Sequence, residues 1–348
     1  MKKLILIALA AVLAACGQSP KGSGREKLAG AGATFPLPYY NLAFKTYRDS
    51  VPAEVSYGGI GSGGGIRSLK DRIVDFAGSD AYLTDAEIAA MPDSVIHIPT
   101  CMGAVVMAYN LPGVEKLKLT GELVADIYLG KITRWNDARI RGINPGVQLP
   151  DLEIHPVYRS DGSGTTFVFS DYLTKVSPAW KETIGAGKSL EWPAGLAAKG
   201  NPGISGTVSQ TEGAVGYIGS EYAFAQHISY ASLQNKAGRF IDPTLESISA
   251  AAAGDLPTDT RCMITDPDAA DAYPISCFTW ILLYKEQGYD KRTREQSEAL
   301  VDLLGWMLGS QAQDLAGKVN YAPLPQQVID NGRAQLGTVT YKGEKLLK

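Results

Sequence analysis

The sequence predicts an α/β protein with two lobes, and three observations support this. Strand-like and helix-like segments take turns along the chain, which is typical of sheets covered by helices. Removing a leader of 15 residues from the 348 leaves 333, which is more than one hydrophobic core usually contains. Loops rich in glycine and small polar residues follow several predicted strands. In open α/β sheets, ligands bind at such loops, beyond the carboxyl ends of the strands.

The predicted elements follow in a regular order. Short strands and helices alternate in the first third, where Tyr40, Phe44 and Tyr47 have the spacing of one helix face. Residues 102–109 are almost continuously apolar, as a buried strand is. The predicted strands are 28–33, 53–57, 73–77, 95–99, 102–109, 153–158, 215–218 and one within 274–284. The predicted helices are 37–48, one from 66, 121–129, one from 167, and 297–309.

Residues 1–15 form a predicted export leader. Lys2 and Lys3 precede an apolar core that is too short to be an ordinary transmembrane helix. The core ends in Leu13-Ala14-Ala15-Cys16, which resembles a bacterial lipobox. We therefore expect cleavage before Cys16, a lipid on that residue, and a flexible tether over residues 16–26. The alternative is an ordinary signal peptide cleaved nearby, with Cys16 incidental.

The composition excludes several classes of function. The formal net charge is −3 and no basic stripe is present, so nucleic-acid binding is not expected. His97, His155 and His227 are far apart and no CxxC pair occurs, so we expect neither a histidine-based metal site nor a cofactor. An anionic ligand would have to be held by local donors, because the overall charge does not attract it.

The segment 159–166, with the sequence Arg-Ser-Asp-Gly-Ser-Gly-Thr-Thr, has the pattern of an anion site. It follows the predicted strand 153–158 and precedes a predicted helix. The first N–H groups of a helix have no partner within the helix, and the helix dipole favours negative charge there. Arg159 and the hydroxyl groups add further donors. The alternative is a helix-capping turn with an incidental arginine.

Three glycine loops in the first third share a second pattern. Residues 30–35, 58–65 and 78–80 each follow a strand and offer backbone N–H groups that a ligand can approach closely. Together with the arginine loop they suggest two lobes that close on one small anion. Residues 59–64 also match GxGxxG, but no acidic residue stands at the distance that a dinucleotide site requires.

The cysteines after the tether are Cys101, Cys262 and Cys277. An exported protein can form disulfides. Cys262 and Cys277 are closest in sequence and flank a loop rich in aspartate and proline, so we expect them to be bonded. Cys101 lies in an apolar run and is expected to be a small buried residue.

Several ordered segments resemble the motifs of one family, PstS, the periplasmic phosphate-binding proteins of high-affinity ABC phosphate transporters. The segments are 30–36, 59–62, 75–80, 126–135, 159–167, 201–204 and 213–218. The resemblance covers nearly the whole chain after the tether. It implies a two-lobed type II periplasmic-binding-protein fold with a ligand cleft between the lobes. Lobe one would combine residues 27–104 with 276–348, and lobe two would be residues 105–275.

The resemblance also implies a phosphate site. Its contacts would be Thr34, Phe35, Ser62, Asp80, Arg159, Ser163, Gly164 and Thr165. Backbone N–H groups, hydroxyl groups and the guanidinium would donate hydrogen bonds, and Asp161 would pair with Arg159. One departure from the pattern is Gly63, which stands where many relatives have a second serine, so that a hydroxyl near Ser62 is missing.

Asp80 has a distinct chemical role in this interpretation. Inorganic phosphate keeps a proton near neutral pH, whereas sulfate has none. An ionised carboxylate accepts a short hydrogen bond from a phosphate O–H. Opposite a bare sulfate oxygen it would suffer a like-charge contact of on the order of several kcal/mol. The alternative is that Asp80 is an acid of a turn or helix cap.

We therefore expect a non-enzymatic receptor that binds inorganic phosphate and delivers it to the subunits of an ABC phosphate permease with their cytoplasmic ATPase. It would work in the bacterial periplasm, held at a membrane by its lipid. One alternative is a phosphatase or phosphotransferase with Ser163 as nucleophile, if the fold brings His155 close. A second is a receptor for sulfate or molybdate. A role in signalling or adhesion beside phosphate binding also stays open.

Overall fold

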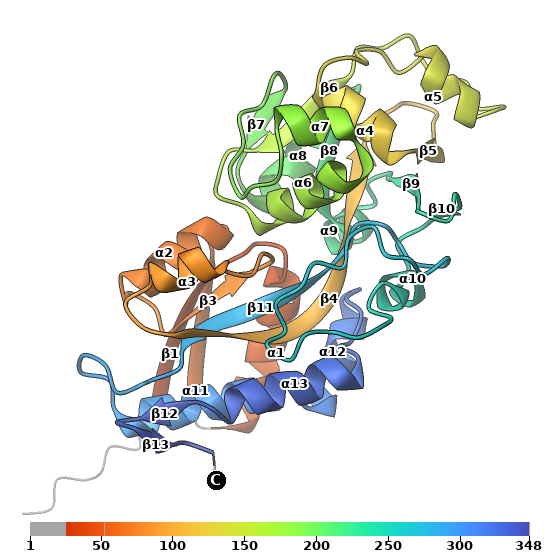
Figure 1. Ribbon diagram of the computed structural model, residues 1–348. Coiled ribbons are helices and arrows are strands. Elements are labelled where there is room, and N and C mark those ends of the chain that lie inside the picture. The colour runs from red at the N-terminus through yellow and green to blue at the C-terminus, as the bar shows by residue number, and fades with distance from the viewer. Residues whose placement is uncertain (1–25, 52, 348) are drawn as a thin grey trace, which may run out of the picture.

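The computed structural model describes residues 26–51 and 53–347. Figure 1 shows an elongated molecule in which strands are flanked by helices in two connected parts. The strands are β1 Glu26–Gly32, β2 Ala53–Gly59, β3 Phe76–Ser79, β4 Val95–Tyr109, β5 Leu117–Leu119, β6 His155–Arg159, β7 Leu196–Ala198, β8 Ala214–Gly219, β9 Ala231–Gln234, β10 Phe240–Ile241, β11 Ser276–Tyr284, β12 Thr340–Tyr341 and β13 Glu344–Lys345. The helices are α1 Leu37–Ser50, α2 Ser62–Lys70, α3 Asp85–Ala89, α4 Gly121–Tyr128, α5 Ala138–Ile143, α6 Gly164–Val176, α7 Pro178–Thr183, α8 Gly200–Gln210, α9 Ser220–Gln226, α10 Leu245–Ala250, α11 Arg294–Met307, α12 Ser310–Lys318 and α13 Gln326–Leu336.

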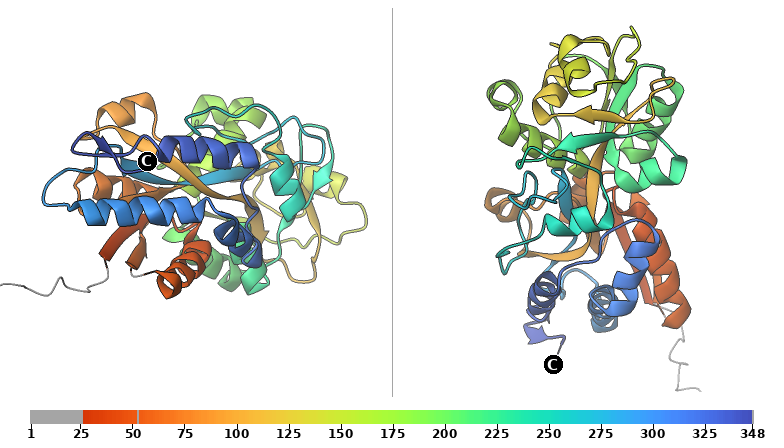
Figure 2. Two further views of the ribbon diagram at one scale, coloured as in Figure 1. Left: turned by 90° about the horizontal axis from the view of Figure 1, so that it is seen from below. Right: turned by 90° about the vertical axis from the view of Figure 1, so that its right-hand side faces the viewer.

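Eight strands form one curled sheet in the order β2-β1-β3-β11-β4-β8-β6-β7. The first three are parallel to one another, β11 is antiparallel to both of its neighbours, and β6 is parallel to β7 and β8. Helices α11 and α13 pack against the strands of the first part, and α8 packs against β6 and β8 in the second. Figure 2 shows the C-terminal helices gathered on the part of the molecule that contains β1. The predicted α/β class and two-lobed architecture are confirmed.

β4 is the strand that the two lobes share. Its first part, Val95 to Ala104, pairs with β11, and its second part, Val105 to Tyr109, pairs with β8. All 15 of its residues are buried. The lobe boundaries drawn from the sequence stay a prediction. Thr260 and Arg261, which that division places in lobe two, donate hydrogen bonds to the carbonyl groups of His97 and Leu83.

Two predicted strands, 95–99 and 102–109, are one strand in the structure. Trp280 of β11 faces Pro99, and its neighbour Thr279 faces Cys101, so Thr100 bulges out of the pairing. Pro99 lacks an N–H group, and proline within a sheet is tolerated next to such a bulge. The side chain of the bulged residue Thr100 is nevertheless bonded: its hydroxyl donates to the Thr279 carbonyl and shares a hydrogen bond with the Tyr40 hydroxyl.

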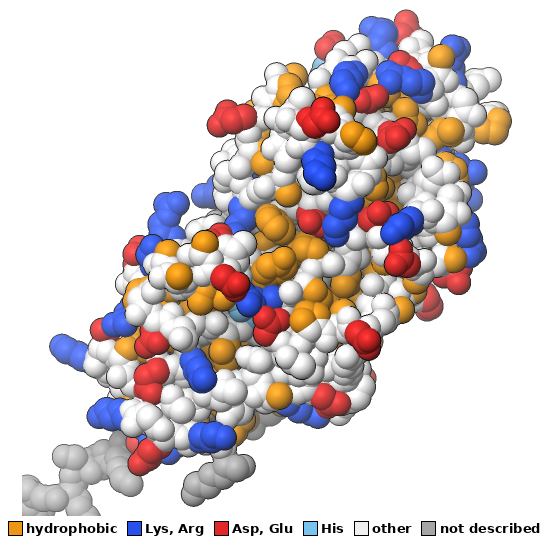
Figure 3. Space-filling model, viewed as in Figure 1, with side chains coloured by type: hydrophobic (Ala, Val, Ile, Leu, Met, Phe, Trp, Pro, Cys, Tyr) orange, Lys and Arg blue, Asp and Glu red, His pale blue; other side chains and the backbone are white. Residues whose placement is uncertain are grey.

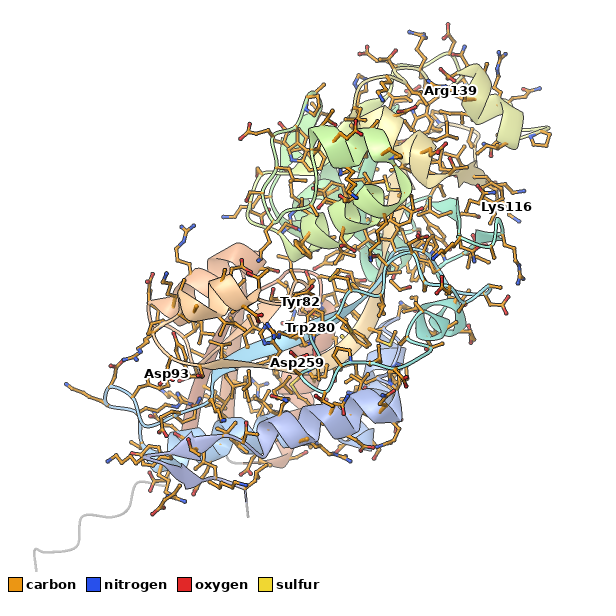
Figure 4. The ribbon with its side chains drawn as sticks, viewed as in Figure 1. Tyr82, Asp93, Lys116, Arg139, Asp259 and Trp280 are labelled. Carbon is orange, nitrogen blue, oxygen red and sulfur yellow. The ribbon has the colours of Figure 1, made fainter. Side chains whose placement is uncertain are left out.

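The predicted disulfide is wrong, because Cys101, Cys262 and Cys277 are all free thiols. Side chains alternate between the faces of a strand, so Cys277 shares a face of β11 with Thr279, while Trp280 points to the opposite face. The Trp280 indole donates to the Thr260 carbonyl, which places the loop containing Cys262 on that opposite face. Figure 4 shows Trp280, Tyr82 and Asp259 close together there. Sequence proximity therefore did not bring the two sulfur atoms to the same side of the sheet. Cys101 is a buried residue, as predicted.

In the described part of the chain, no helix combines the length and the apolarity that crossing a membrane requires. The predicted leader, the cleavage site at Cys16 and nearly all of the tether lie outside the described residues.

Candidate functional site

The predicted site residues come together where strands of both lobes end. β1, β2 and β3 run parallel, so their carboxyl ends meet at one edge, from which Thr34, Ser62 and Asp80 project. The carboxyl end of β6 supplies the segment from Arg159 to Thr165. All eight residues are buried, which a site enclosed between lobes requires. Figure 3 shows hydrophobic side chains gathered on the visible face at the junction of the two lobes.

The segment 159–165 forms the start of α6. Ser163 is the residue that caps this helix, since its hydroxyl oxygen accepts from the Thr166 N–H at 3.0 Å. The Ser163 N–H donates to the Lys188 carbonyl at 2.8 Å, which fixes the loop from behind. The N–H groups of Gly164 and Thr165 therefore stand at the positive end of a helix of 13 residues.

Arg159 and Asp161 form the predicted pair. The guanidinium donates through Nε and Nη2 to the two carboxylate oxygens at 2.7 and 2.6 Å, and the arginine side chain is 1% exposed. Gly200 adds a backbone N–H to Asp161 at 3.0 Å. Burial alone would raise the pKa of Asp161, but the hydrogen bonds and the charge of Arg159 outweigh burial and hold this pKa below its usual value. The pair orients the free edge of the guanidinium toward Thr165.

Asp80 lies against the start of α6. A Cβ atom added to Gly164 would stand 2.7 Å from Asp80 Oδ2, so the carboxyl group and the helix backbone nearly touch. Burial raises the pKa of Asp80 to about 7, although hydrogen bonds from Thr279 and Thr165 and the charge of Arg159 lower it in part. The Thr279 hydroxyl donates to Asp80 Oδ1 at 2.8 Å. This carboxyl group can therefore lose or gain its proton near neutral pH.

Backbone contacts join the two lobes beside Asp80. The Ser62 hydroxyl oxygen accepts from the Gly164 N–H at 3.1 Å, and the Gly63 N–H donates to the Gly162 carbonyl at 2.9 Å. A Cβ atom at Gly63 would lie only 3.1 Å from the Gly162 Cα atom. The missing serine at position 63 thus coincides with a close approach of two backbones, which a larger residue would push apart.

The turn after β1 is held from both lobes. Tyr222 of α9 donates its hydroxyl to the Thr34 carbonyl at 2.5 Å, and Tyr321 donates to the Phe35 carbonyl. In a trans peptide the N–H points away from the C=O. The N–H of Phe35 is therefore turned away from Tyr222. The Phe35 ring is buried against Tyr321, with 6.0 Å between the ring centroids.

Sequence reasoning missed three residues of this cluster. Asn201 is fully buried and donates to both Thr34 and Thr165, and Tyr222 and Thr279 contact Thr34 and Asp80. Asn201 stands in a segment, 201–204, that the sequence had marked as motif-like, so a signal existed. Tyr222 and Thr279 carry no local signal, because only the tertiary fold brings α9 and β11 to this edge.

The arrangement offers no catalytic pair around Ser163. The hydroxyl is used to cap α6, and His155 stands at the opposite end of β6 from Arg159. A strand of five residues separates its ends by ~13 Å. Within residues 26–51 and 53–347, no group of three or more His, Cys, Asp or Glu side chains is placed to hold a metal ion. The donors and the one carboxyl group of this cluster are suited to non-covalent recognition of an anion.

Comparison with known proteins finds similarity to proteins that bind phosphate. A family model described as the PBP superfamily domain matches residues 17–311. A phosphate-binding protein PstS of Xylella fastidiosa is 40% identical over 308 residues, covering 87% of this chain and 83% of its own. A solved high-affinity periplasmic phosphate-binding protein, PfluDING, bound with phosphate, superimposes with a TM-score of 0.72 at 21% identity over 88% of this chain and 93% of its own. An ABC-type phosphate transport receptor from Vibrio cholerae does so with a TM-score of 0.56 at 21% identity over 86% and 100%.

Proposed function

This chain belongs to the PstS family of phosphate-binding proteins within the PBP superfamily, and we propose from that premise that its two lobes close around inorganic phosphate for ABC-dependent import. The family is one of solute-binding receptors, so the protein is a binding component and not an enzyme. High affinity requires that the ligand leave water, and burial of the whole cluster meets that requirement.

The single observation that carries the proposal is a buried carboxyl group surrounded by donors from both lobes. We assign the donors as the Thr34, Ser62, Ser163 and Thr165 hydroxyls, the N–H groups of Phe35 and Gly164, and the Arg159 guanidinium. The Gly164 N–H would be shared between the ligand and the Ser62 oxygen. Asp80 is the acceptor among them, with Asp161 orienting Arg159. An oxyanion that carries one proton satisfies such a set completely, because it accepts many hydrogen bonds and donates one.

The same set argues against a sulfate or molybdate receptor. A fully deprotonated anion would satisfy the donors but would place an oxygen lone pair against the Asp80 carboxylate. Asp80 would have to be protonated to avoid this repulsion. Phosphate avoids it with its own proton, which makes phosphate the better fit above the pKa of Asp80.

We further propose the cellular setting. Cys16 carries a lipid that tethers the mature chain through residues 16–26 to a membrane facing the bacterial periplasm. Residues 27–104 with 276–348 form lobe one and residues 105–275 form lobe two, and the closed liganded receptor docks on the permease subunits, whose cytoplasmic ATPase drives import.

The test is calorimetric titration of phosphate and of sulfate onto the purified, delipidated chain after removal of bound phosphate. Tight binding of phosphate with little heat from sulfate is expected. No heat from phosphate would overturn the proposal. Incubation with a phosphate ester under the same conditions checks the enzyme alternative, and sustained release of phosphate would favour it.

A further inference from the structure

Asn201 is a buried amide that connects the two lobes at the candidate site. It is the second residue of α8 and is fully buried. Its backbone N–H and its side-chain Nδ2 both donate to the Thr34 hydroxyl oxygen at 3.0 Å. The same Nδ2 donates to the Thr165 hydroxyl oxygen at 3.2 Å. One side chain thus reaches two residues that we assign to phosphate, one on each lobe.

The orientation of this amide is fixed by its fourth hydrogen bond. The Gly219 N–H donates to Asn201 Oδ1 at 3.0 Å. A backbone N–H can only donate, so the atom that faces Gly219 must be the amide oxygen. The NH₂ group therefore faces the two threonines, and the opposite orientation would set two donors against each other.

This orientation determines where the threonine hydroxyl protons point. A hydroxyl oxygen has two lone pairs and one proton. The Thr34 oxygen accepts twice from Asn201, and the Thr165 oxygen accepts from Asn201 and from Arg159 Nη1 at 3.4 Å. With both lone pairs engaged, each hydroxyl has only its O–H left to donate, and at Thr165 the carboxyl group of Asp80 competes with the ligand for this proton. Neither can present a lone pair to an anion.

We propose that Asn201 is a positioning residue that makes Thr34 and Thr165 obligate hydrogen-bond donors toward the bound oxyanion. The inference rests on the proposed function, since it requires phosphate to lie against these hydroxyls. Asn201 has a specificity role as well, because the two hydroxyls can then serve only a ligand that accepts hydrogen bonds at both positions.

The central test is Asn201→Asp, which keeps the shape and replaces the NH₂ donor with a carboxylate oxygen. The hydroxyls would then donate to position 201 and turn their lone pairs toward the ligand. We expect the phosphate Kd to rise ~100-fold or more. Lowering the pH should restore part of the affinity relative to the parent at the same pH, because a protonated carboxyl group can donate again. Asn144→Asp is the matched control: Asn144 is a buried amide of lobe two that bonds to Lys118 and Ile140, and its replacement should leave the phosphate Kd within about twofold.

A double-mutant cycle covers the case in which the Asp variant does not fold. Thr34→Val removes the hydroxyl and should raise the phosphate Kd ~10-fold or more in the parent. In an Asn201→Ala background only the backbone N–H of residue 201 still donates to the Thr34 oxygen, so the hydroxyl is less strictly directed and the same change should cost less. Thr34→Ser, which keeps the hydroxyl, should restore binding in the parent.

Two results would overturn the role of Asn201: a phosphate Kd unchanged in the Asn201 variants, or strictly additive effects of Thr34→Val and Asn201→Ala. Both are distinct from failure of the proposed function, in which the parent protein itself would not bind phosphate.

Discussion

At the scale of single residues, Asp80 combines two opposing influences. Burial favours its protonated form, whereas Thr279, Arg159 and Thr165 favour the ionised form, and the resulting pKa is about 7. Its position after β3 was predictable from the glycine loop at residues 78–80. The pKa of Asp80 could not be predicted from the sequence, because Thr279 and Arg159 reach this residue from distant segments.

The first prediction concerns anion selectivity. Asp80→Asn keeps the shape, removes the charge and supplies an N–H that can face either anion. We expect a smaller preference for phosphate over sulfate, mainly because sulfate binds better. Calorimetric titration of both anions onto the parent and the variant at one pH measures this preference. A variant that discriminates as sharply as the parent would show that Asp80 does not set selectivity.

The second prediction concerns the stability of the phosphate-free protein. The folded pKa of Asp80, about 7, lies above its ordinary value of 3.8. The folded state is therefore favoured by this group below pH ~4, and that advantage is lost as the pH rises to ~7. In Asp80→Asn this loss is absent, so the variant should gain ~2–4 kcal/mol in unfolding free energy relative to the parent between pH 4 and pH 8. Urea unfolding at both pH values tests this, and a difference that does not vary with pH contradicts it.

The third prediction concerns Arg159. Arg159→Ala removes a charged donor and leaves Asp161 with its carboxylate near the ligand and without its cation. Phosphate binding should weaken by roughly 1.5–3 kcal/mol or more. The exposed pair of Arg134 and Asp151 offers the control, since Arg134→Ala should leave the phosphate affinity unchanged. An unaltered dissociation constant in Arg159→Ala would place the site elsewhere.

At the scale of elements, the local sequence predicted where the loops lie better than how the neighbouring helices pack. Glycines and small polar residues marked the ends of β1, β2, β3 and β6, because these loops need backbone freedom and free N–H groups. Helix α2 begins at Ser62, inside what the sequence suggested was a loop up to residue 65. Its glycines allow the helix to lie against β1, where a Cβ atom at Gly65 would meet the Ala31 carbonyl at 2.5 Å. Such packing has no local sequence signal.

The fourth prediction tests the meeting of the β2–α2 and β6–α6 loops. Gly61 has a φ of +84°, and a Cβ atom there would stand 2.3 Å from Asp161 Oδ2 across the lobes. Gly61→Ala should weaken phosphate binding, since the clash exists only where the lobes meet. Gly130→Ala is the control, because Gly130 has a φ of +71° and nothing within 4 Å of such a Cβ atom.

Gly130→Ala should lose stability by ~1 kcal/mol from backbone strain. Gly61→Ala should lose more, because the Gly61 φ of 84° and ψ of 152° lie in a region that is essentially restricted to glycine. Only Gly61→Ala should lose affinity for phosphate. Equal affinities in the two variants would mean that the closed arrangement of these loops is not the one that binds.

At the scale of the whole molecule, contacts from both lobes meet over the site. Besides the glycine contact, Lys188 of the loop between α7 and β7 pairs with Glu87 of α3 at 2.6 Å. Chain length and the glycine loops predicted two lobes, and the resemblance to PstS predicted their type. None of these predicted that one strand, β4, would belong to both lobes, because the apolar pattern of β4 does not show where its partner changes.

The fifth prediction concerns lobe motion. A ligand shifts a two-state hinge only through contacts that it makes better in one state. Because the assigned donors lie on both lobes, saturating phosphate should reduce the radius of gyration in small-angle X-ray scattering. Arg159→Ala at the same phosphate concentration is the control and should stay closer to the phosphate-free curve. Identical curves with and without phosphate for the parent would contradict the hinge.

The placement of β11 also has a consequence for how the polypeptide is made. This strand lies between β3 and β4, yet it comes from the last quarter of the chain, whereas the strands β8, β6 and β7 at the other end of the same sheet are complete by Gly219. During synthesis the N-terminal segments must wait for a central strand that arrives late, and contacts between such distant segments form slowly. A nascent chain that ends before Ser276 therefore lacks the strand that joins β3 to β4, although β4, β8, β6 and β7 are already present.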